Sequence, residues 1–347
     1  MAYTTIDDPS AFFQAALYTG NASSNKAITN DGNSDLQPDW VWIKERSSTS
    51  SHFLNDSVRG AGENIYSNNT SADGTNTALF TSFNSDGFTV GNTNQGNQNN
   101  ETYVAWQWKA GTSFSNDASS TSVGSIDSAG SINTDAGFAI ISYTGTGEVG
   151  TIAHGLGTTP ELVILRNREV TSNWWVWGGF LGSNQIMELD TSAAKYNPNG
   201  NYHNDTMPTS SVISIGSDGQ VSGNGQSHIC YAFHSVQGYS KIGSFVSNNT
   251  TDNTFVYCGF KPALVLLKST TSTNDWMIFD YKRDPGNVTQ HKLYPNITSA
   301  EATTENDIDL LSNGFKLRNA HGANTFIFMA FAEQPFVTST GVPATAR

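Results

Sequence analysis

A strand-like pattern occurs three times in this chain and constrains its fold more than any other feature. The three copies are residues 102–109 (TYVAWQWK), 227–234 (SHICYAFH) and 325–332 (TFIFMAFA). Large apolar residues recur at every second position, which is typical of a strand with one buried face. When the copies are superposed, Tyr231 and Met329 stand where the first copy has Trp106. Because size is kept and the indole is not, we interpret Trp106 and Trp108 as core residues rather than a sugar-stacking platform.

Two further patterns repeat in the same order along the chain. An opening strand is predicted at residues 13–21, 138–146 and 239–248, and a proline-led strand begins at Pro38, Pro160 and Pro262. Trp40 and Trp42 of the first proline-led strand align with leucine and isoleucine in the other copies, so we predict that they are also core. The spacing of these strands predicts an all-β fold of three tandem β-sandwich units, jelly-roll or lectin-like, of about 100 residues each.

Each unit is also expected to contain a hairpin with a tight turn. Asp-Gly and Asn-Gly pairs accept the positive φ that such turns need. The predicted turns are Ser85-Asp86-Gly87, Ser217-Asp218-Gly219 and Ser312-Asn313-Gly314. The second copy has Gln220 where the other two have Phe, so its hairpin is expected to differ in shape.

Composition predicts where the units begin and end. The predicted regions are a first sandwich with a short N-terminal segment at 1–111, a polar linker at 112–135, a second sandwich at 136–237, a third at 238–337 and a C-terminal tail at 338–347. The linker is predicted because its residues are almost all small or polar. One short helix is expected after Asp7 and Asp8, whose carboxylates would lie near its positive end.

The charge of the chain argues against two classes of partner. Lys plus Arg is 17 against 30 for Asp plus Glu, which gives a formal net charge of −13 over 347 residues. Nucleic acids and anionic membrane surfaces both require clustered cations, so neither is an expected partner. No signal peptide and no apolar run of membrane-spanning length is recognised, so membrane insertion is not expected.

The sequence contains no motif that predicts catalysis, a cofactor or a metal. His154 lies before Pro160 in a predicted turn, where a structural role is favoured over a catalytic one. Paired carboxylates of a glycosidase are set in space rather than along the chain, so that activity stays open. The candidate acids are Asp56, Glu63, Asp190 and Asp280. The two cysteines, Cys230 and Cys258, are interpreted as buried thiols, and a disulfide between them stays open.

Four side chains are the candidates for contact with a sugar or a protein at the surface. In residues 173–177 (NWWVW), strand alternation places Trp174 on the face opposite to its two tryptophan neighbours. Trp276 is the corresponding residue of the third unit. Tyr202 and His203 lie in a polar loop, NGNYHNDT. Aromatic rings of this kind bind sugars or proteins when they are exposed, so we predict a contact surface at these four residues.

Several motifs together resemble a known family. They are PDWVWIKERSSTSSHFLNDSVRG, SFNSDGFTVG, TYVAWQWKAG, YTGTGEVGTIAHGLGTTPELVILRNR, IDLLSNGFKLR and MAFAEQPF. They look like repeated-domain structural proteins of marine tailed bacteriophages, such as those of cyanobacteria, and the resemblance extends from about Ile6 to Val337. It implies a non-enzymatic virion protein labelled tail-fibre-like, made in the host cytoplasm, and it carries over no catalytic residue.

The expectation is therefore a tail or head fibre subunit that contacts the host surface. Its expected partners are further copies of the same chain, forming a trimer, neighbouring virion proteins of the tail or capsid, and a glycan or protein of the host cell surface. A capsid decoration protein is the alternative structural role. A tailspike that depolymerises host glycan is the enzymatic alternative, and it would require an acidic pair in a groove.

Overall fold

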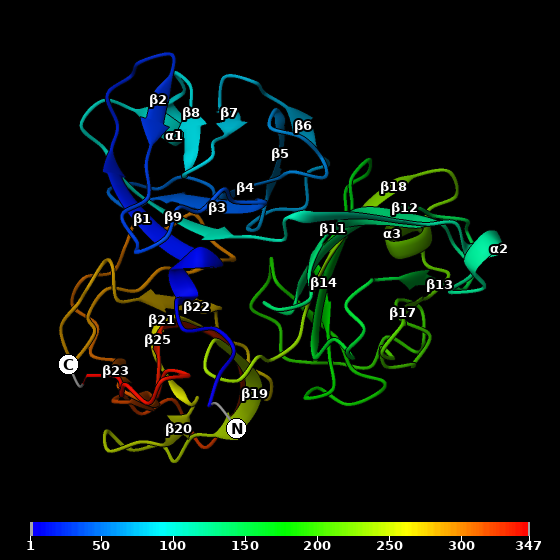
Figure 1. Cartoon of the computed structure of the whole chain (residues 1–347). Coiled ribbons are helices and arrows are strands. Elements are labelled where there is room, and N and C mark those ends of the chain that lie inside the picture. The colour runs from blue at the N-terminus through cyan, green and yellow to red at the C-terminus, as the bar shows by residue number, and fades with distance from the viewer. Residues whose placement is uncertain (1–2, 346–347) are drawn as a thin grey trace.

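Nearly all of the regular structure is antiparallel β-sheet. The structure is a computed structural model and describes residues 3–345. Three regions of the chain each form a sandwich of one large and one small sheet, and the sandwiches make three lobes around a common centre (Figure 1). The helices within the described residues are short: η1 (Pro9–Ala11), α1 (Asn94–Asn97), α2 (Ala118–Thr121) and α3 (Gly219–Ser222). The predicted all-β sandwich fold is confirmed.

The first sandwich is formed by residues before position 111. Its large sheet has the order β1-β9-β3-β4-β5-β6 and its small sheet the order β2-β8-β7. The strands are β1 (Phe13–Thr19), β2 (Lys26–Ile28), β3 (Trp40–Glu45), β4 (Phe53–Asp56), β5 (Glu63–Tyr66), β6 (Gly74–Thr75), β7 (Phe80–Phe83), β8 (Phe88–Val90) and β9 (Thr102–Trp108). Because strand residues alternate between faces, Val41 and Ile43 share an apolar cluster with Phe88, while Trp40 and Trp42 belong to another.

The second sandwich has a longer large sheet. Its order is β10-β11-β12-β18-β14-β15-β16, and the small sheet pairs β13 with β17. The strands are β10 (Thr112–Asn116), β11 (Ser128–Asn133), β12 (Phe138–Thr144), β13 (Gly150–Ala153), β14 (Leu162–Asn167), β15 (Trp175–Trp177), β16 (Met187–Glu188), β17 (Val212–Ile215) and β18 (Ser227–Phe233). Ile141 and Val163 pack with Ile213 between these two sheets.

The third sandwich has the smallest large sheet. The order of that sheet is β19-β25-β21-β22, and the small sheet has the order β20-β24-β23. The strands are β19 (Ser240–Val246), β20 (Phe255–Tyr257), β21 (Phe260–Ser269), β22 (Met277–Asp280), β23 (Ile308–Leu311), β24 (Gly314–Leu317) and β25 (Thr325–Pro335). Val265 and Phe328 pack with Phe315 between the two sheets.

Four strands follow one order in all three large sheets. The matching sets are β1-β9-β3-β4, β12-β18-β14-β15 and β19-β25-β21-β22. Their registers also match, because the first residue of the opening strand lies opposite Trp108, Phe233 or Phe331 in the three sheets. Positions in one sandwich can therefore be compared with positions in another by strand register.

Each large sheet has one face toward its own small sheet and one face away from it. The faces that point away from the small sheets meet in one apolar core shared by the three sandwiches. Trp40 of the first sandwich stacks on Tyr231 of the second, with ring centroids 4.6 Å apart. Phe331 of the third contacts Phe13 of the first at 5.3 Å and Phe233 of the second at 6.1 Å. The four tryptophans predicted to be core, at positions 40, 42, 106 and 108, are at most 1% exposed, which confirms that prediction.

Two local predictions are wrong. The stretch 112–135, predicted to be a polar linker, forms β10 and β11 of the second large sheet, because β11 pairs along β12 and β10 pairs along β11. Asp218 does not begin a hairpin turn: its carboxylate accepts a hydrogen bond from the backbone N–H of Gln220 and caps α3. The chain turns earlier, where the N–H of Thr209 donates to the carbonyl of Val212.

Other local predictions hold. The turn at Asp86 closes the hairpin of β7 and β8, with Gly87 at a φ of 93°, and Asn313 closes that of β23 and β24. The expected N-terminal helix is the single 3₁₀ turn η1, which Asp8 caps through the N–H of Ser10. Both cysteines are free thiols.

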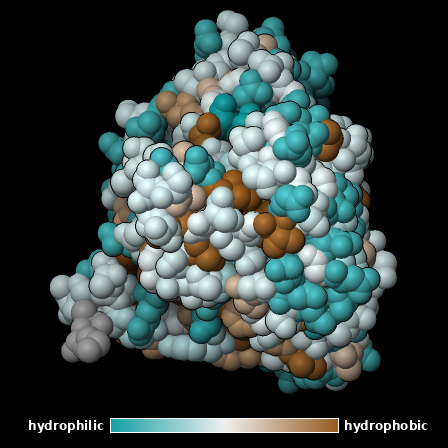
Figure 2. Space-filling view, turned by 90° about the vertical axis from the view of Figure 1, so that its right-hand side faces the viewer, coloured by the Kyte–Doolittle hydropathy of each residue, from teal (hydrophilic) through white to brown (hydrophobic). Residues whose placement is uncertain are grey.

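The surface is mainly polar. On the face that carries α2 and β13, apolar side chains gather in a central hollow that polar and neutral residues surround (Figure 2). In the part of the chain that the structure describes, no helix is long and apolar enough to span a membrane.

Candidate functional site

The densest buried polar groups lie where one sandwich meets the next. At the first junction, between the first and second sandwiches, Asp56 ends β4 and Arg59 follows in the next turn. The Arg59 Nε donates to Asp56 Oδ2 at 2.6 Å, and the Tyr231 hydroxyl from β18 donates to the same oxygen at 2.7 Å. The side chains of Asp56 and Arg59 have no exposed area. An ion pair of the first sandwich is thus completed by a hydroxyl of the second.

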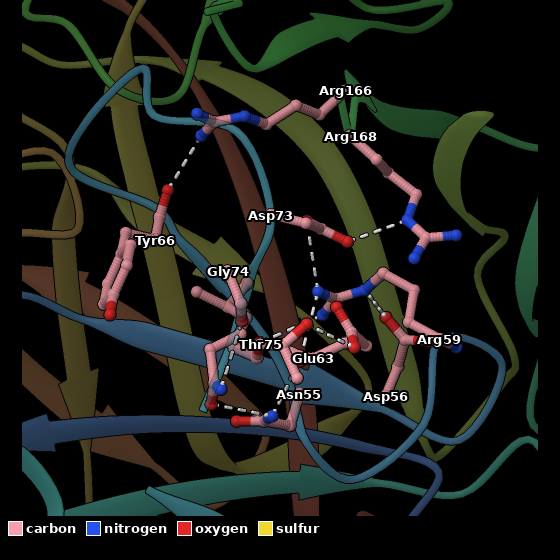
Figure 3. Close-up of polar contacts among 12 residues, drawn as sticks. Asn55, Asp56, Arg59, Glu63, Tyr66, Asp73, Gly74, Thr75, Arg166 and Arg168 are labelled. Atoms are coloured by element: carbon pink, nitrogen blue, oxygen red, sulfur yellow. Dashed lines mark hydrogen bonds and ion pairs between the residues drawn. The ribbon is translucent and has the colours of Figure 1, made fainter. Parts of the chain in front are cut away.

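A second acid extends this network toward solvent. Asp73 lies 3.4 Å from Arg59 Nη1 and 2.7 Å from the Nε of Arg168, which follows β14 (Figure 3). Burial opposes the charge on Arg59, but its carboxylate partners, Asp56 foremost and Asp73 beside it, outweigh burial and raise the pKa of Arg59. Burial and the Asp56 carboxylate raise the pKa of Tyr231 well above its ordinary value. The arginine therefore stays charged and the tyrosine stays a donor.

Arg166 of β14 points from the second sandwich into the backbone of the first. Its Nη1 donates to the carbonyl of Tyr66 at 2.9 Å (Figure 3). The same Nη1 donates to the carbonyl of Asn69 at 2.6 Å, and Nη2 donates to the carbonyl of Ser71. Burial lowers the pKa of Arg166 to about 10. The guanidinium also lies 5.2 Å from the ring centroid of Trp174. One side chain thus fixes the path of the loop after β5.

The third junction, between the third and first sandwiches, has the same arrangement. Arg283 Nε donates to Asp280 Oδ2 at 2.5 Å, and Trp106 of β9 donates to that oxygen at 2.8 Å. Glu301 bridges the junction by contacting Arg283 at 2.8 Å and Arg46 of the first sandwich at 2.7 Å. Burial raises the pKa of Glu301, but the two arginines outweigh it and hold this pKa below its ordinary value.

The second junction, between the second and third sandwiches, lacks this ion pair. By strand register, Gly178 and Leu181 stand in place of Asp56 and Arg59. Met329 stands in place of Tyr231, and these three apolar residues line a cavity of about 10 Å³. The second junction also has a polar contact, since the Lys268 ammonium of the third sandwich donates to the carbonyl of Ser192 of the second at 3.2 Å.

Two of the predicted surface residues are buried and form hydrogen bonds between sandwiches. Trp174 has no exposed area, and its Nε1 donates to the Tyr66 carbonyl across the first junction at 2.7 Å. Trp276 is 2% exposed, and its Nε1 donates to the Glu188 carbonyl across the second junction at 2.8 Å. The predicted surface contact is wrong for both, because a neighbouring sandwich covers the face that strand alternation leaves open.

The two predicted loop residues pack on β15. His203 has no exposed area, stacks 5.7 Å from Trp177, and donates from Nε2 to the Ser183 carbonyl at 3.0 Å. Burial lowers its pKa, so it is a neutral packing residue rather than a surface contact. Tyr202 is half-buried and stacks 3.8 Å from Trp175, and burial raises its pKa to about 12.

The candidate acids lie in different places. Asp56 and Asp280 pair with arginines, whereas Glu63 accepts a hydrogen bond from Thr75. Asp190 accepts from the N–H of Trp174 at 2.8 Å, and burial raises its pKa to about 6. His154 is buried in its turn and donates to the carbonyl of Thr209, as a structural histidine would. Within residues 3–345, no group of three or more metal-ligating side chains comes together.

Sequence reasoning missed the arginines of the junctions. The spacing Asp-x-x-Arg, which starts at the last residue of β4 and of β22, occurs at positions 56–59 and 280–283 and is the signal that would have found two of them. Arg166 had no such signal, because its partners are backbone carbonyls of another sandwich.

Comparison with known proteins places the chain in a family. Curated proteins give no significant match. The profile of a family described as a domain of unknown function, DUF7483, matches residues 8–335, which is nearly the whole chain and includes all three sandwiches. The chain therefore belongs to the DUF7483 family.

Proposed function

We propose that this chain is a non-enzymatic structural protein of a bacteriophage particle, a fibre or appendage subunit that contacts the host surface. The motif resemblance described above is the basis for the phage assignment. The structural observation that supports a mechanical role is the arrangement of the three sandwiches around one core, with each sandwich joined to both of the others.

The chemistry of the junctions suits such a role. Exposed ion pairs weaken as salt screens them, but the ion pairs of the first and third junctions are withdrawn from water. The indole N–H groups of Trp174 and Trp276 donate to backbone carbonyls, and hydrogen bonds between uncharged groups are not weakened by salt screening. The block of three sandwiches is therefore expected to keep its shape in seawater, which a particle of a marine phage must do.

The test is to locate the chain in purified particles. Mass spectrometry of gradient-purified phage should detect it at a fixed stoichiometry, and gold-labelled antibody should mark fibres in electron micrographs. The isolated chain, of 37.3 kDa, is expected to elute as a trimer in seawater-like salt. Its absence from particles that carry its gene would overturn the proposal.

A capsid decoration protein is the second candidate, and the compact three-lobed shape favours it (Figure 1). A fibre built from tandem units would place them in a row, whereas these surround a centre. The same gold label distinguishes the two roles, because a decoration protein would be marked over the whole capsid. Release of reducing ends from host polysaccharide by the purified chain would instead support a depolymerase.

A further inference from the structure

One backbone hydrogen bond recurs at matching places in all three junctions. In each, the N–H of a loop residue in one sandwich donates to a carbonyl of its neighbour, just beyond a buried cation, which is Arg166, Lys268 or Lys44. The bonds run from Asp73 to Arg168 at 2.7 Å in the first junction, from Lys195 to Thr270 at 3.1 Å in the second, and from Glu301 to Arg46 at 2.8 Å in the third. Each junction therefore has one amide that can report its opening separately.

The third junction has a histidine where the other two have a tryptophan. Trp174 and Trp276, whose indole N–H groups cross the first and second junctions, stand directly before β15 and β22. By strand register, the residue at this place before β4 is His52. The carbonyl beside its ring is that of Tyr294 of the third sandwich. Tyr294 precedes Glu301 by the same number of residues as the acceptors of the two indoles precede the loop amides of their junctions, so His52 is the matching contact of the third junction.

The hydrogen bond to Trp42 fixes the protonation of His52. The His52 side chain has no exposed area, and its Nδ1 lies 2.9 Å from the Nε1 of Trp42. An indole N–H can only donate, so Nδ1 is the acceptor and carries no proton. The ring is therefore neutral, with its proton on Nε2. At Nε2 no hydrogen bond of normal geometry forms within residues 3–345, but the Tyr294 carbonyl is near enough to favour a proton on the ring.

The surroundings of His52 oppose a second proton. The charged side chains that act on the ring are Lys44 of β3 and Arg283, which follows β22, and both are cations. Burial together with these two cations lowers the pKa of His52 well below its ordinary value. The acids of this junction, Asp280 and Glu301, already pair with Arg283. A second proton would have to enter at Nδ1, where it would meet the indole N–H of Trp42 and add a third buried positive charge.

We propose that His52 makes the third junction an acid-sensitive switch, at which the ring of three sandwiches opens when a proton from water binds Nδ1. Protonation breaks the hydrogen bond from Trp42 and releases the loop 294–301 of the third sandwich from the first. The first and second junctions have an indole at this place, which does not titrate, so they stay closed. The switch does not depend on the proposed virion role, because it follows from the contacts of His52 alone.

The pH range of the switch follows from proton linkage. An opened junction exposes His52 to water, where its pKa is about 6.5, while the closed junction takes up no proton. The ratio of open to closed junctions should therefore rise about tenfold per pH unit below about pH 6.5. Other groups of the junction act outside the range from about pH 7 to about pH 5 or in the opposite sense. The pKa of Glu301 is held below its ordinary value, Lys44 has a pKa of about 8, and a proton on His291, 3.5 Å from Glu301, would strengthen that contact.

Hydrogen exchange of the full chain, read amide by amide by NMR, tests the switch. The open fraction at each junction is the measured exchange rate divided by the intrinsic rate at the same pH. Between about pH 7 and about pH 5, the open fraction at the Glu301 amide should rise about 20-fold. The open fractions at the amides of Asp73 and Lys195, which report the first and second junctions, should not rise. Equal exchange at both pH values for Glu301, or an equal rise at all three amides, would overturn the proposal.

Two variants separate His52 from other histidines. His52→Asn keeps an oxygen acceptor for Trp42 that takes up no proton, so the rise at Glu301 should disappear, and a rise that survives would overturn the proposal. The matched control is His228→Asn, because His228 is also buried but contacts the Gln226 carbonyl of its own sandwich, and this variant should keep the rise. Nitrogen NMR of the His52 ring in the unchanged protein requires no variant to fold. It should show no proton on Nδ1 at about pH 7, and a proton there would also overturn the proposal.

Discussion

Removing one charge of the Asp56–Arg59 pair should destabilise the whole protein. Arg59→Leu leaves the Asp56 carboxylate buried, with two backbone N–H groups and the Tyr231 hydroxyl as donors but no direct counter-charge. Leucine is an acceptable shape at this place, because Leu181 occupies the matching position at the second junction. The expected loss in free energy of unfolding therefore comes from the buried carboxylate that has lost its counter-charge, and not from poorer packing.

The magnitude follows from the burial of both side chains, which have no exposed area. Breaking such a pair by removing one partner costs about 3–5 kcal/mol. Asp56→Ala should cost a similar amount, because the guanidinium would keep only carbonyls and the more distant Asp73. The double variant strands neither charge, so we expect its loss to be smaller than the sum by about 2–4 kcal/mol.

The assay is urea unfolding followed by tryptophan fluorescence and by circular dichroism, with free energies of unfolding for all four proteins. The control is the pair Lys282–Asp31, which also joins two sandwiches, at 2.6 Å, but has side chains that are 24% and 67% exposed. Its coupling should be at most about 1 kcal/mol. A coupling no larger than this for the buried pair would refute the reasoning.

Three further outcomes are expected. Trp174→Phe should lower the free energy of unfolding by about 1–2 kcal/mol, because the bond to the Tyr66 carbonyl is lost; unchanged stability in urea would contradict this role. The raised pKa of Asp190 means that the folded state keeps a proton which the unfolded state loses between about pH 4 and 6, so this contribution falls as pH rises. The unchanged protein should therefore lose up to about 3 kcal/mol of its free energy of unfolding between pH 4 and pH 7, at about 1.4 kcal/mol per pKa unit, whereas Asp190→Asn should not show this loss. Urea unfolding of both proteins at both pH values would measure the difference. Finally, burial raises the pKa of both Cys230 and Cys258, so a thiol reagent such as DTNB should react with them only after unfolding, and fast reaction of the folded protein would contradict their burial.

Much of the fold was predictable because apolar residues at every second position mark the buried face of a strand. The three opening strands, the proline-led strands and the core role of Trp40 and Trp106 follow from period two and from the exchange of indole for other large residues. The three-unit repeat remains a prediction, although the shared strand order is what it would produce. Polarity misled the reading of residues 112–135, because serine and glycine favour loops on their own but pair in a sheet where a neighbouring strand such as β12 offers a partner.

The candidate site was much less predictable than the fold. Alternation correctly placed Trp174 opposite to its neighbours, but it cannot tell solvent from an adjoining sandwich. Local sequence also could not show that Asp218 caps a helix, since the same Asp-Gly pair suits either a cap or a turn. Partners far apart along the chain, such as Arg166 and Tyr66, are fixed only by how the sandwiches meet.

The closed arrangement of three sandwiches limits how such a chain can change length during evolution. In a linear array, a unit added at the end buries one more face and leaves the others undisturbed. Here each sandwich already contacts both of the others, through the junctions at Tyr231, Trp276 and Trp106, so none has a free junction surface. A fourth sandwich would have to break a junction and widen the central core. Gene duplication is therefore expected to lengthen loops or append separate domains in this family, while the number of sandwiches around the core stays at three.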